Sequence, residues 1–258
     1  MDGVETGTDK LLLDFPAEAV ARLTISNPPK RNALDHEILD AITATVPKLD
    51  RGIEVRCLIV TGEDPVFSAG YDIGGIPEES FETDAEALVA HPFTAALEAV
   101  AGHPWPVVAA INGHAIAGGC VFAMAADIRL MSAGTIGLTE LAVGAMFPMS
   151  ALEICRYAMG PSVTPATLQA QSIDVSTAAA FGWVDEVVTA EELVPRSIAL
   201  ARELSEFSPA AYAMTKQQLH RPARAAIDGG TEIDETVRAS WMSEETHARF
   251  RAYMDALH

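Results

Sequence analysis

The sequence has few basic residues and a large excess of acidic ones. Lys and Arg together number 17, against 36 Asp and Glu, which gives a formal net charge of −19. A chain of this charge repels nucleic acid and anionic membrane surfaces, so we expect neither as a partner. If the ligand is itself anionic, local basic groups must offset this overall field.

Long apolar runs and a targeting segment are also missing. No apolar run approaches the ~20 residues that a membrane span requires. The N-terminal stretch MDGVETGTDK is acidic and has neither the apolar core of a signal peptide nor the arginines of a transit peptide. We therefore expect a cytoplasmic protein.

Cysteine is scarce, and several common motifs are absent. Cys57, Cys120 and Cys155 lie far apart among apolar neighbours and lack metal-ligand spacing, which is typical of buried reduced thiols and predicts no metal site. The sequence contains no GxGxxG fingerprint opening a helix, no GxxxxGK[ST] and no GxSxG. These absences argue against a dinucleotide-binding fold, a P-loop enzyme and a serine hydrolase.

Strand and helix signals alternate over the first two-thirds of the 258 residues. This alternation predicts an α/β fold with a parallel sheet and crossover helices, whereas the last third is rich in helix signals alone. A break is expected around 222–230 in this helical tail. The predicted strands cover 21–26, 57–61, 106–111 and 127–131, and the predicted helices cover 36–45, 85–100, 120–126 and 150–159.

Two glycine-containing segments follow predicted strands. They are FSAGYDI (67–73) and AINGHAIAGGC (110–120), and each places glycine where the backbone turns sharply. A helix that starts near Gly118 directs the positive end of its dipole outward. Taken singly, each segment is an ordinary strand-to-helix turn. Two N–H groups that converge from such turns would stabilise a developing oxyanion.

Together, in this order and spacing, the two segments resemble the crotonase (enoyl-CoA hydratase/isomerase) superfamily. Further similar segments run along nearly the whole chain: ISNPPKRNAL (25–34), CLIVTG (57–62), the segment 178–188 ending in GWVDEVV, and SPAA (208–211). The resemblance implies a crotonase-like repeated ββα core over residues 1–195 and a helical C-terminal trimerisation region over 196–258. It also implies a homotrimer or a dimer of trimers.

The resemblance implies an acyl-CoA thioester ligand and no cofactor beyond the CoA moiety of that substrate. The oxyanion-hole N–H groups correspond to those of Tyr71 and Gly118. Lys30 or Arg31 would lie near the CoA phosphates, although both are equally explained as surface charges. The full set of expected substrate-binding residues is Lys30, Arg31, Ala33, Ser68, Ala69, Tyr71, Asp72, Ile73, Gly74 and Gly118.

The reaction depends on which carboxylates are present. Removing the α-proton of a thioester gives an enolate with its charge on oxygen, and losing one oxyanion-hole donor costs roughly 10²–10³ in rate. Hydratases of the family use two glutamates; here Val121 stands at one of these positions and Glu140 at the other. The apolar neighbours of Glu140 predict a raised pKa, although a capping or salt-bridged glutamate is the simpler interpretation of the residue alone.

One carboxylate beside an oxyanion hole suits the transfer of a proton from C2 to C4, which is Δ3–Δ2 enoyl-CoA isomerisation. The stretch 136–148, IGLTELAVGAMFP, resembles the isomerase branch of the family. Hydration, hydrolysis or decarboxylation stays open, with His114, Tyr71 or Asp72 as the second group. A non-catalytic acyl-CoA binder is a further alternative. Segments 74–100 and 146–154 are expected to set the acyl-chain preference.

Overall fold

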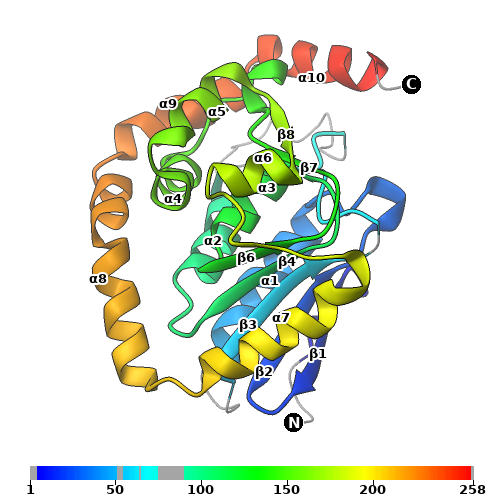
Figure 1. Ribbon diagram of the computed structural model, residues 1–258. Coiled ribbons are helices and arrows are strands. Elements are labelled where there is room, and N and C mark those ends of the chain that lie inside the picture. Colours follow the sequence, from blue (N-terminus) through cyan, green and yellow to red (C-terminus); the bar gives the residue numbers. More distant parts are fainter. Residues whose placement is uncertain (1–4, 51–54, 64, 75–89, 257–258) are drawn as a thin grey trace.

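The computed structural model describes residues 5–50, 55–63, 65–74 and 90–256. Its centre is a six-stranded sheet in the order β1-β2-β3-β4-β6-β9 (Figure 1). Apart from β1, which pairs antiparallel to β2, neighbouring strands are parallel. The strands are β1 (Leu11–Ala17), β2 (Val20–Ile25), β3 (Cys57–Gly62), β4 (Val107–Ile111), β6 (Ile128–Met131) and β9 (Glu186–Val187). The predicted parallel α/β architecture is confirmed.

Both faces of this sheet are covered by helices. Alternate residues of a strand point to opposite faces, so Leu58 and Val60 of β3 join the larger core while Cys57 and Ile59 join the smaller one. The larger core contains α1 (His36–Asp50), α2 (Ala90–Ala101), α3 (Gly118–Met124) and α4 (Met149–Met159). The smaller core packs against α7 (Ala190–Ser205), which crosses the front of the sheet in Figure 1.

A second, three-stranded sheet lies beside the N-terminus of α3. It contains β5 (Ala115–Ile116), β7 (Thr135–Gly137) and β8 (Ser172–Asp174) in that order. The short helices α5 (Val163–Gln169) and α6 (Val175–Ala180) flank β8 in the chain. β5 leads into α3, and β7 leads toward Glu140. Because β5 and β7 are paired, this sheet places the start of α3 next to the segment that carries Glu140.

The C-terminal helices form an arc around the outside of α4. They are α8 (Pro209–Asp228), α9 (Thr231–Trp241) and α10 (Glu244–Ala256), and α9 and α10 lie along the upper edge in Figure 1. The predicted break around 222–230 is present at the end of that range: α8 continues through Pro222 to Asp228, and Gly229 and Gly230 separate it from α9. Pro222 lacks the backbone N–H that a helix interior normally uses. The helix stays intact there because α8 packs on α4 and its Lys216 forms an ion pair with Asp127.

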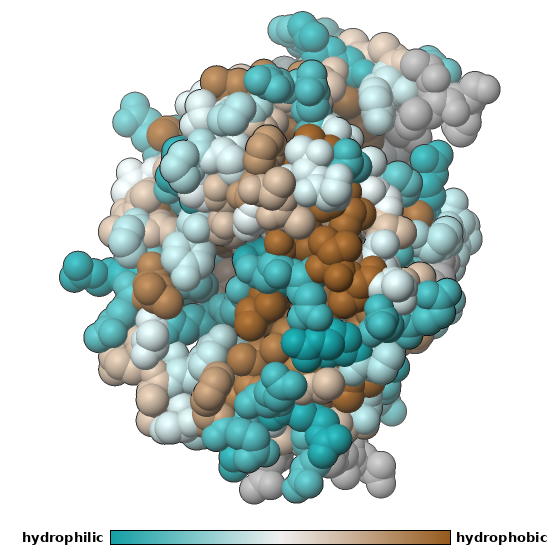
Figure 2. Space-filling view, in the orientation of Figure 1, coloured by the Kyte–Doolittle hydropathy of each residue, from teal (hydrophilic) through white to brown (hydrophobic). Residues whose placement is uncertain are grey.

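The expected boundary at residue 195 falls inside α7, and the division of the chain into a core and a C-terminal region stays a prediction. In the described part of the chain, no helix combines the length and apolar character needed to cross a bilayer. Figure 2 shows apolar surface gathered near the middle of one face, between more polar margins. The expected homotrimer also stays a prediction.

Candidate active site

The backbone of Tyr71 is held on one side by a short parallel bridge to Leu34. The Leu34 N–H donates to the carbonyl oxygen of Gly70 at 2.8 Å, and the Asp72 N–H donates to that of Leu34 at 3.1 Å. In a parallel bridge of this kind the flanking residues make the bonds, so the N–H of Tyr71 points to the opposite side. That side faces α3.

Gly118 meets Tyr71 there. As the first residue of α3, Gly118 has an N–H group without an acceptor inside the helix. A Cβ atom on Gly118 would lie 3.2 Å from the Tyr71 nitrogen and 2.9 Å from Cε2 of Phe93. The fold therefore brings the two predicted donor residues together, and a side chain at position 118 would require the Phe93 ring and the Tyr71 backbone to shift.

Ser68 holds the loop that contains Gly70 and Tyr71 through hydrogen bonds of its side chain. Its side chain is fully buried; its Oγ donates to the carbonyl oxygen of Asn32 at 2.8 Å and accepts from the Gly70 N–H at 3.1 Å. A Cβ atom on Gly119 would lie 2.4 Å from the carbonyl oxygen of Ser68, so the two glycine-containing segments pack backbone against backbone. Ser68, expected to contact the substrate, is not among the cavity-lining residues and instead holds the backbone between Asn32 and Gly70.

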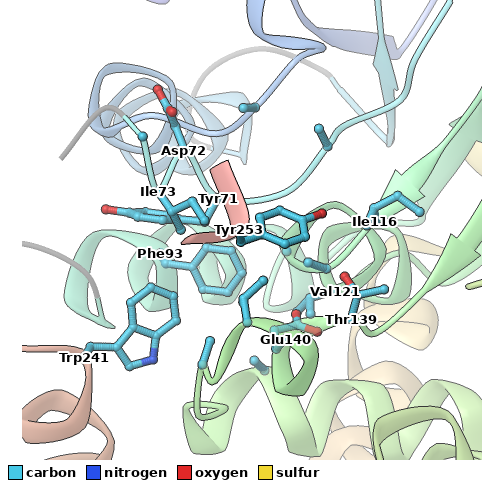
Figure 3. Close-up of a pocket in the computed structure, with 18 of the residues that line it drawn as sticks. Tyr71, Asp72, Ile73, Phe93, Ile116, Val121, Thr139, Glu140, Trp241 and Tyr253 are labelled. Carbon is cyan, nitrogen blue, oxygen red and sulfur yellow. The ribbon is translucent and has the colours of Figure 1, made fainter. Parts of the chain in front are cut away.

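A cavity of about 570 Å³ opens beside this pair of segments (Figure 3). All the expected substrate-binding residues except Ser68 line it, as does Glu140. Lys30 and Arg31 are exposed and lie with Asp72 and Gly74 in its wall. The rest of the wall is largely apolar and includes Phe93, Ile116, Ala117, Val121, Val143, Ala145, Met146, Phe147, Pro148, Ala151, Trp241 and Tyr253.

Glu140 begins a short 3-10 helix, Glu140–Val143, directly after the small sheet. Its Oε2 atom is buried and has no hydrogen-bond partner. Burial raises the pKa of this carboxyl group to about 8, while hydrogen bonds with the backbone amides of Glu140 and Thr139 act in the opposite direction. The raised pKa predicted from the apolar neighbours is confirmed, and it suits a group that must both accept and release a proton.

Other acid and base groups are placed differently. Val121 lies one helical turn after Gly118 and presents an apolar side chain to the cavity. Asp72 lines the cavity but forms an ion pair with Lys30 at 2.5 Å. His114 is exposed, is hydrogen-bonded to Thr135 and does not line the cavity. Among the residues that the structure describes, Glu140 is thus the one carboxyl group of the cavity without a cation beside it.

The phenol of Tyr71 faces away from Glu140, as Figure 3 shows. Its hydroxyl is hydrogen-bonded to Nε2 of His36 at 2.7 Å, and its ring packs edge-on against Phe93 and Trp241. Burial raises the pKa of the phenol above its ordinary value. Tyr71 therefore shapes the cavity wall, and its hydroxyl does not point toward the carboxyl group.

The C-terminal helices contribute two residues that sequence reasoning missed. Trp241 at the end of α9 and Tyr253 in α10 both line the cavity. The indole of Trp241 donates from Nε1 to the carbonyl oxygen of Met146 at 2.8 Å. Both lie more than 100 residues beyond the glycine segments in the chain, and no local pattern marks them, because only the folding of the tail over the core brings them there.

In this parallel α/β core, Tyr71, Gly118 and the desolvated carboxyl group of Glu140 line one cavity. Two backbone N–H groups beside a carboxyl group are typical of enzymes that stabilise an oxyanion while they move a proton. The family model described as enoyl-CoA hydratase/isomerase matches residues 16–256. The chain belongs to this family, as the resemblance predicted.

The relatives differ in their names, and the solved structures among them share the fold of this chain. A probable enoyl-CoA hydratase of Mycobacterium leprae is 30% identical over 225 residues, which cover 86% of this chain and 85% of the relative. The structure of an enoyl-CoA isomerase of Mycobacterium tuberculosis has a TM-score of 0.78 at 28% identity and covers 90% of this chain and 98% of its own. The structure of an enoyl-CoA hydratase/isomerase of Xanthobacter autotrophicus has a TM-score of 0.83 at 25% identity and covers 96% of this chain and 93% of its own. The predicted crotonase-type fold is confirmed.

Proposed function

We propose that this protein is an acyl-CoA enzyme that moves a double bond of an enoyl-CoA thioester from the Δ3 to the Δ2 position. One observation carries the proposal: the cavity places the desolvated carboxyl group of Glu140 beside the Tyr71–Gly118 pair, while Val121 takes the place of a second carboxylate. A single proton carrier suits isomerisation, which has no net gain or loss of water.

The reaction divides between backbone and side chain. The N–H groups of Tyr71 and Gly118 would hold the thioester oxygen, and the carboxylate of Glu140 takes a proton from C2 of the 3-enoyl group. The electron pair of that C–H bond spreads over a dienolate whose charge rests mainly on the held oxygen. The carboxylic acid then returns the proton to C4, and the double bond is left between C2 and C3. No group beyond the CoA moiety of the substrate is required.

The mouth of the cavity is where the CoA part would lie. Lys30 and Arg31 line this region and are exposed, so they are available to phosphate groups in an otherwise acidic protein. Lys30 is held by its ion pair with Asp72, whose side chain is only 9% exposed. The Asp72 carboxylate thus fixes the position of the ammonium group and offsets part of its charge, while the exposed N–H groups of Lys30 can still donate to a phosphate.

Hydration of a 2-enoyl-CoA is the second candidate, favoured by the name of the M. leprae relative. It would require Glu140 to activate water without a second carboxylate. His114 does not line the cavity. The hydroxyl of Tyr71 faces away from Glu140 (Figure 3) and is hydrogen-bonded to His36. The third candidate, binding of acyl-CoA without turnover, predicts that enoyl-CoA esters bind and are recovered unchanged.

The deciding experiment follows 3-hexenoyl-CoA and 2-hexenoyl-CoA separately with the purified protein and its Glu140→Gln variant. We expect conversion of the 3-enoyl to the 2-enoyl ester, at least about 100-fold slower in Glu140→Gln because the proton carrier is lost. Val121→Glu is the matched variant, and it should raise the ratio of hydration to isomerisation. Undiminished isomerisation in folded Glu140→Gln, or faster water addition than isomerisation in the wild type, would contradict the proposal.

A further inference from the structure

His36 and Tyr71 are joined by a hydrogen bond that the proposed chemistry does not use. The Nε2 atom of His36 and the hydroxyl of Tyr71 lie 2.7 Å apart, with the donor set by the tautomer of the imidazole. The two residues are 35 positions apart in the chain. The bond therefore ties the loop that carries one oxyanion-hole donor to the start of α1.

The start of α1 is itself a fixed point. The carboxylate of Asp35 accepts from the Ile38 N–H at 3.0 Å, as an N-cap does. The ammonium group of Lys10 in turn contacts Asp35 at 2.8 Å and Glu37 at 2.6 Å. His36 lies between these two acidic residues, so its backbone is held before its side chain reaches Tyr71.

The ring of Tyr71 connects its hydrogen bond with His36 to the residues around both donors. It packs edge-on against Trp241 and Phe93, with centroid distances of 5.9 and 6.4 Å. Phe93 in turn lies against Gly118, the second donor residue, because a Cβ atom there would come within 2.9 Å of the ring. The side chain of Tyr71 is thus in contact with the surroundings of both donors, whereas the Leu34 bridge holds only one edge of its backbone.

We infer that His36 is a positioning residue: through the phenol of Tyr71 it fixes the direction of the Tyr71 N–H toward the thioester oxygen. The inference rests on the proposed function insofar as that function places a thioester in the cavity. A phenylalanine at 71 would fill the same space and lack the anchor. The effect is directional, so it concerns the carbonyl oxygen of the ligand and leaves the rest of the CoA ester unaffected.

The experiment compares two ligands that differ in that oxygen. Butyryl-CoA has a thioester carbonyl, and its thioether analogue S-butyl-CoA lacks it. Affinities for both are measured by calorimetry for the wild type, His36→Ala, Tyr71→Phe and the double variant. We expect the wild type to prefer the thioester and the single variants to lose this preference about threefold to tenfold, the range of one neutral hydrogen bond. The double variant should lose no more than either single one.

Two further variants separate positioning from general loss of structure. His36→Gln keeps a polar group within reach of the phenol and should restore part of the preference. Asp40→Ala, at an exposed position of the same helix, should leave it unchanged. In turnover assays with 3-hexenoyl-CoA, His36→Ala should raise KM by about the factor lost in the thioester preference and lower kcat/KM by at least that factor.

The outcomes distinguish the two levels of the proposal. An unchanged thioester preference in His36→Ala, or an equal loss of affinity for both ligands, overturns the positioning role and leaves the isomerase proposal standing. A wild type that binds both ligands equally shows that the hole is not used, and overturns both.

Discussion

Glu140 shows how burial changes the acid strength of one residue, in the direction that its apolar sequence neighbours predict. Its carboxyl group has a buried oxygen without a partner and a pKa raised to about 8 by burial. The thiols of Cys120 and Cys155 lie within its electrostatic range, and their own pKa values are raised chiefly by burial. The carboxyl group therefore lies in a low-dielectric pocket where the uncharged form is favoured.

This pKa sets the pH dependence of the proposed reaction. The ionised carboxylate is the base, so kcat/KM for 3-hexenoyl-CoA should rise nearly tenfold per pH unit from pH 6, bend near pH 8 and level off about one pH unit above that. Affinity for S-butyl-CoA over the same range is the control, and should change far less. A profile that is flat or falling between pH 6 and 8 would show that Glu140 is already ionised in the free enzyme and is not the titrating base.

At the scale of elements, the site exists because two backbone segments touch. A Cβ atom on Gly119 would lie 2.4 Å from the carbonyl oxygen and 2.9 Å from the Cβ atom of Ser68. Ala117, just before α3, has φ 50° and ψ −124°, a conformation that residues with a Cβ atom rarely adopt. The entry to α3 is thus strained and tightly packed at the point where it presents the Gly118 N–H.

Gly119→Ala should therefore push the two segments apart. We expect a loss of about 2 kcal/mol or more in the free energy of unfolding, in the range of overpacked sites, together with a weaker thioester preference. Urea unfolding and the paired-ligand assay measure the two effects. Gly229→Ala is the matched control, because its Cβ atom would meet nothing closer than the Ala225 carbonyl oxygen at 3.3 Å. Equal stability of the two variants would show that the segments adjust freely.

The elements differ in how far the sequence predicts them. Buried parallel strands such as β3 and β4 are continuous apolar runs and were predicted within a residue or two. β1 was not predicted, because Asp14 and Pro16 interrupt its apolar pattern. The short strands β5, β7, β8 and β9 have two or three residues each, too few for a periodicity to show.

The site residues also differ in whether a local sequence pattern marks them. Tyr71, Gly118 and Glu140 stand in local motifs, so the family resemblance locates them. His36 and Trp241 reach the site only through tertiary contacts, and no local pattern marks either residue. The expected helix over 85–100 is described from Ala90 onward. Residues 75–89 of segment 74–100, which is expected to set the acyl-chain preference, lie outside the described residues.

At the scale of the whole molecule, a buried ion pair attaches the C-terminal helices to the sheet. The ammonium group of Lys216 on α8 lies 2.8 Å from Asp127, and both side chains are almost inaccessible, at 7% and 13% exposed. The same carboxylate accepts from the Val107 N–H at 2.8 Å, at the start of β4. The ion pair therefore attaches α8 to the sheet. The helices that follow it, α9 and α10, place Trp241 and Tyr253 at the cavity.

Lys216→Ala should leave the carboxylate of Asp127 buried without its cation. Such a change costs roughly 3–5 kcal/mol in the free energy of unfolding. Arg156→Ala, which breaks a more exposed pair with Glu153, is the control and should cost less than about 1 kcal/mol. Urea unfolding compares the two variants. Similar small losses would show that α8 is held by its apolar packing alone.

The net charge of −19 opposes the arrival of an anion such as the proposed CoA ester, whereas Lys30 and Arg31, which line the cavity, would attract that anion at short range. Because added salt shortens the screening length from about 30 Å at 0.01 M to about 8 Å at 0.15 M, it removes the long-range repulsion before the local attraction. We expect kcat/KM for 3-hexenoyl-CoA to rise several-fold over this range and to fall at higher salt.

The corresponding pantetheine thioester, which lacks the phosphates, should show little change. Arg31→Gln should weaken the fall at high salt, because less local attraction is left to screen. A fall in kcat/KM from the lowest salt onward would mean that the basic groups at the cavity mouth outweigh the acidic surface at every distance.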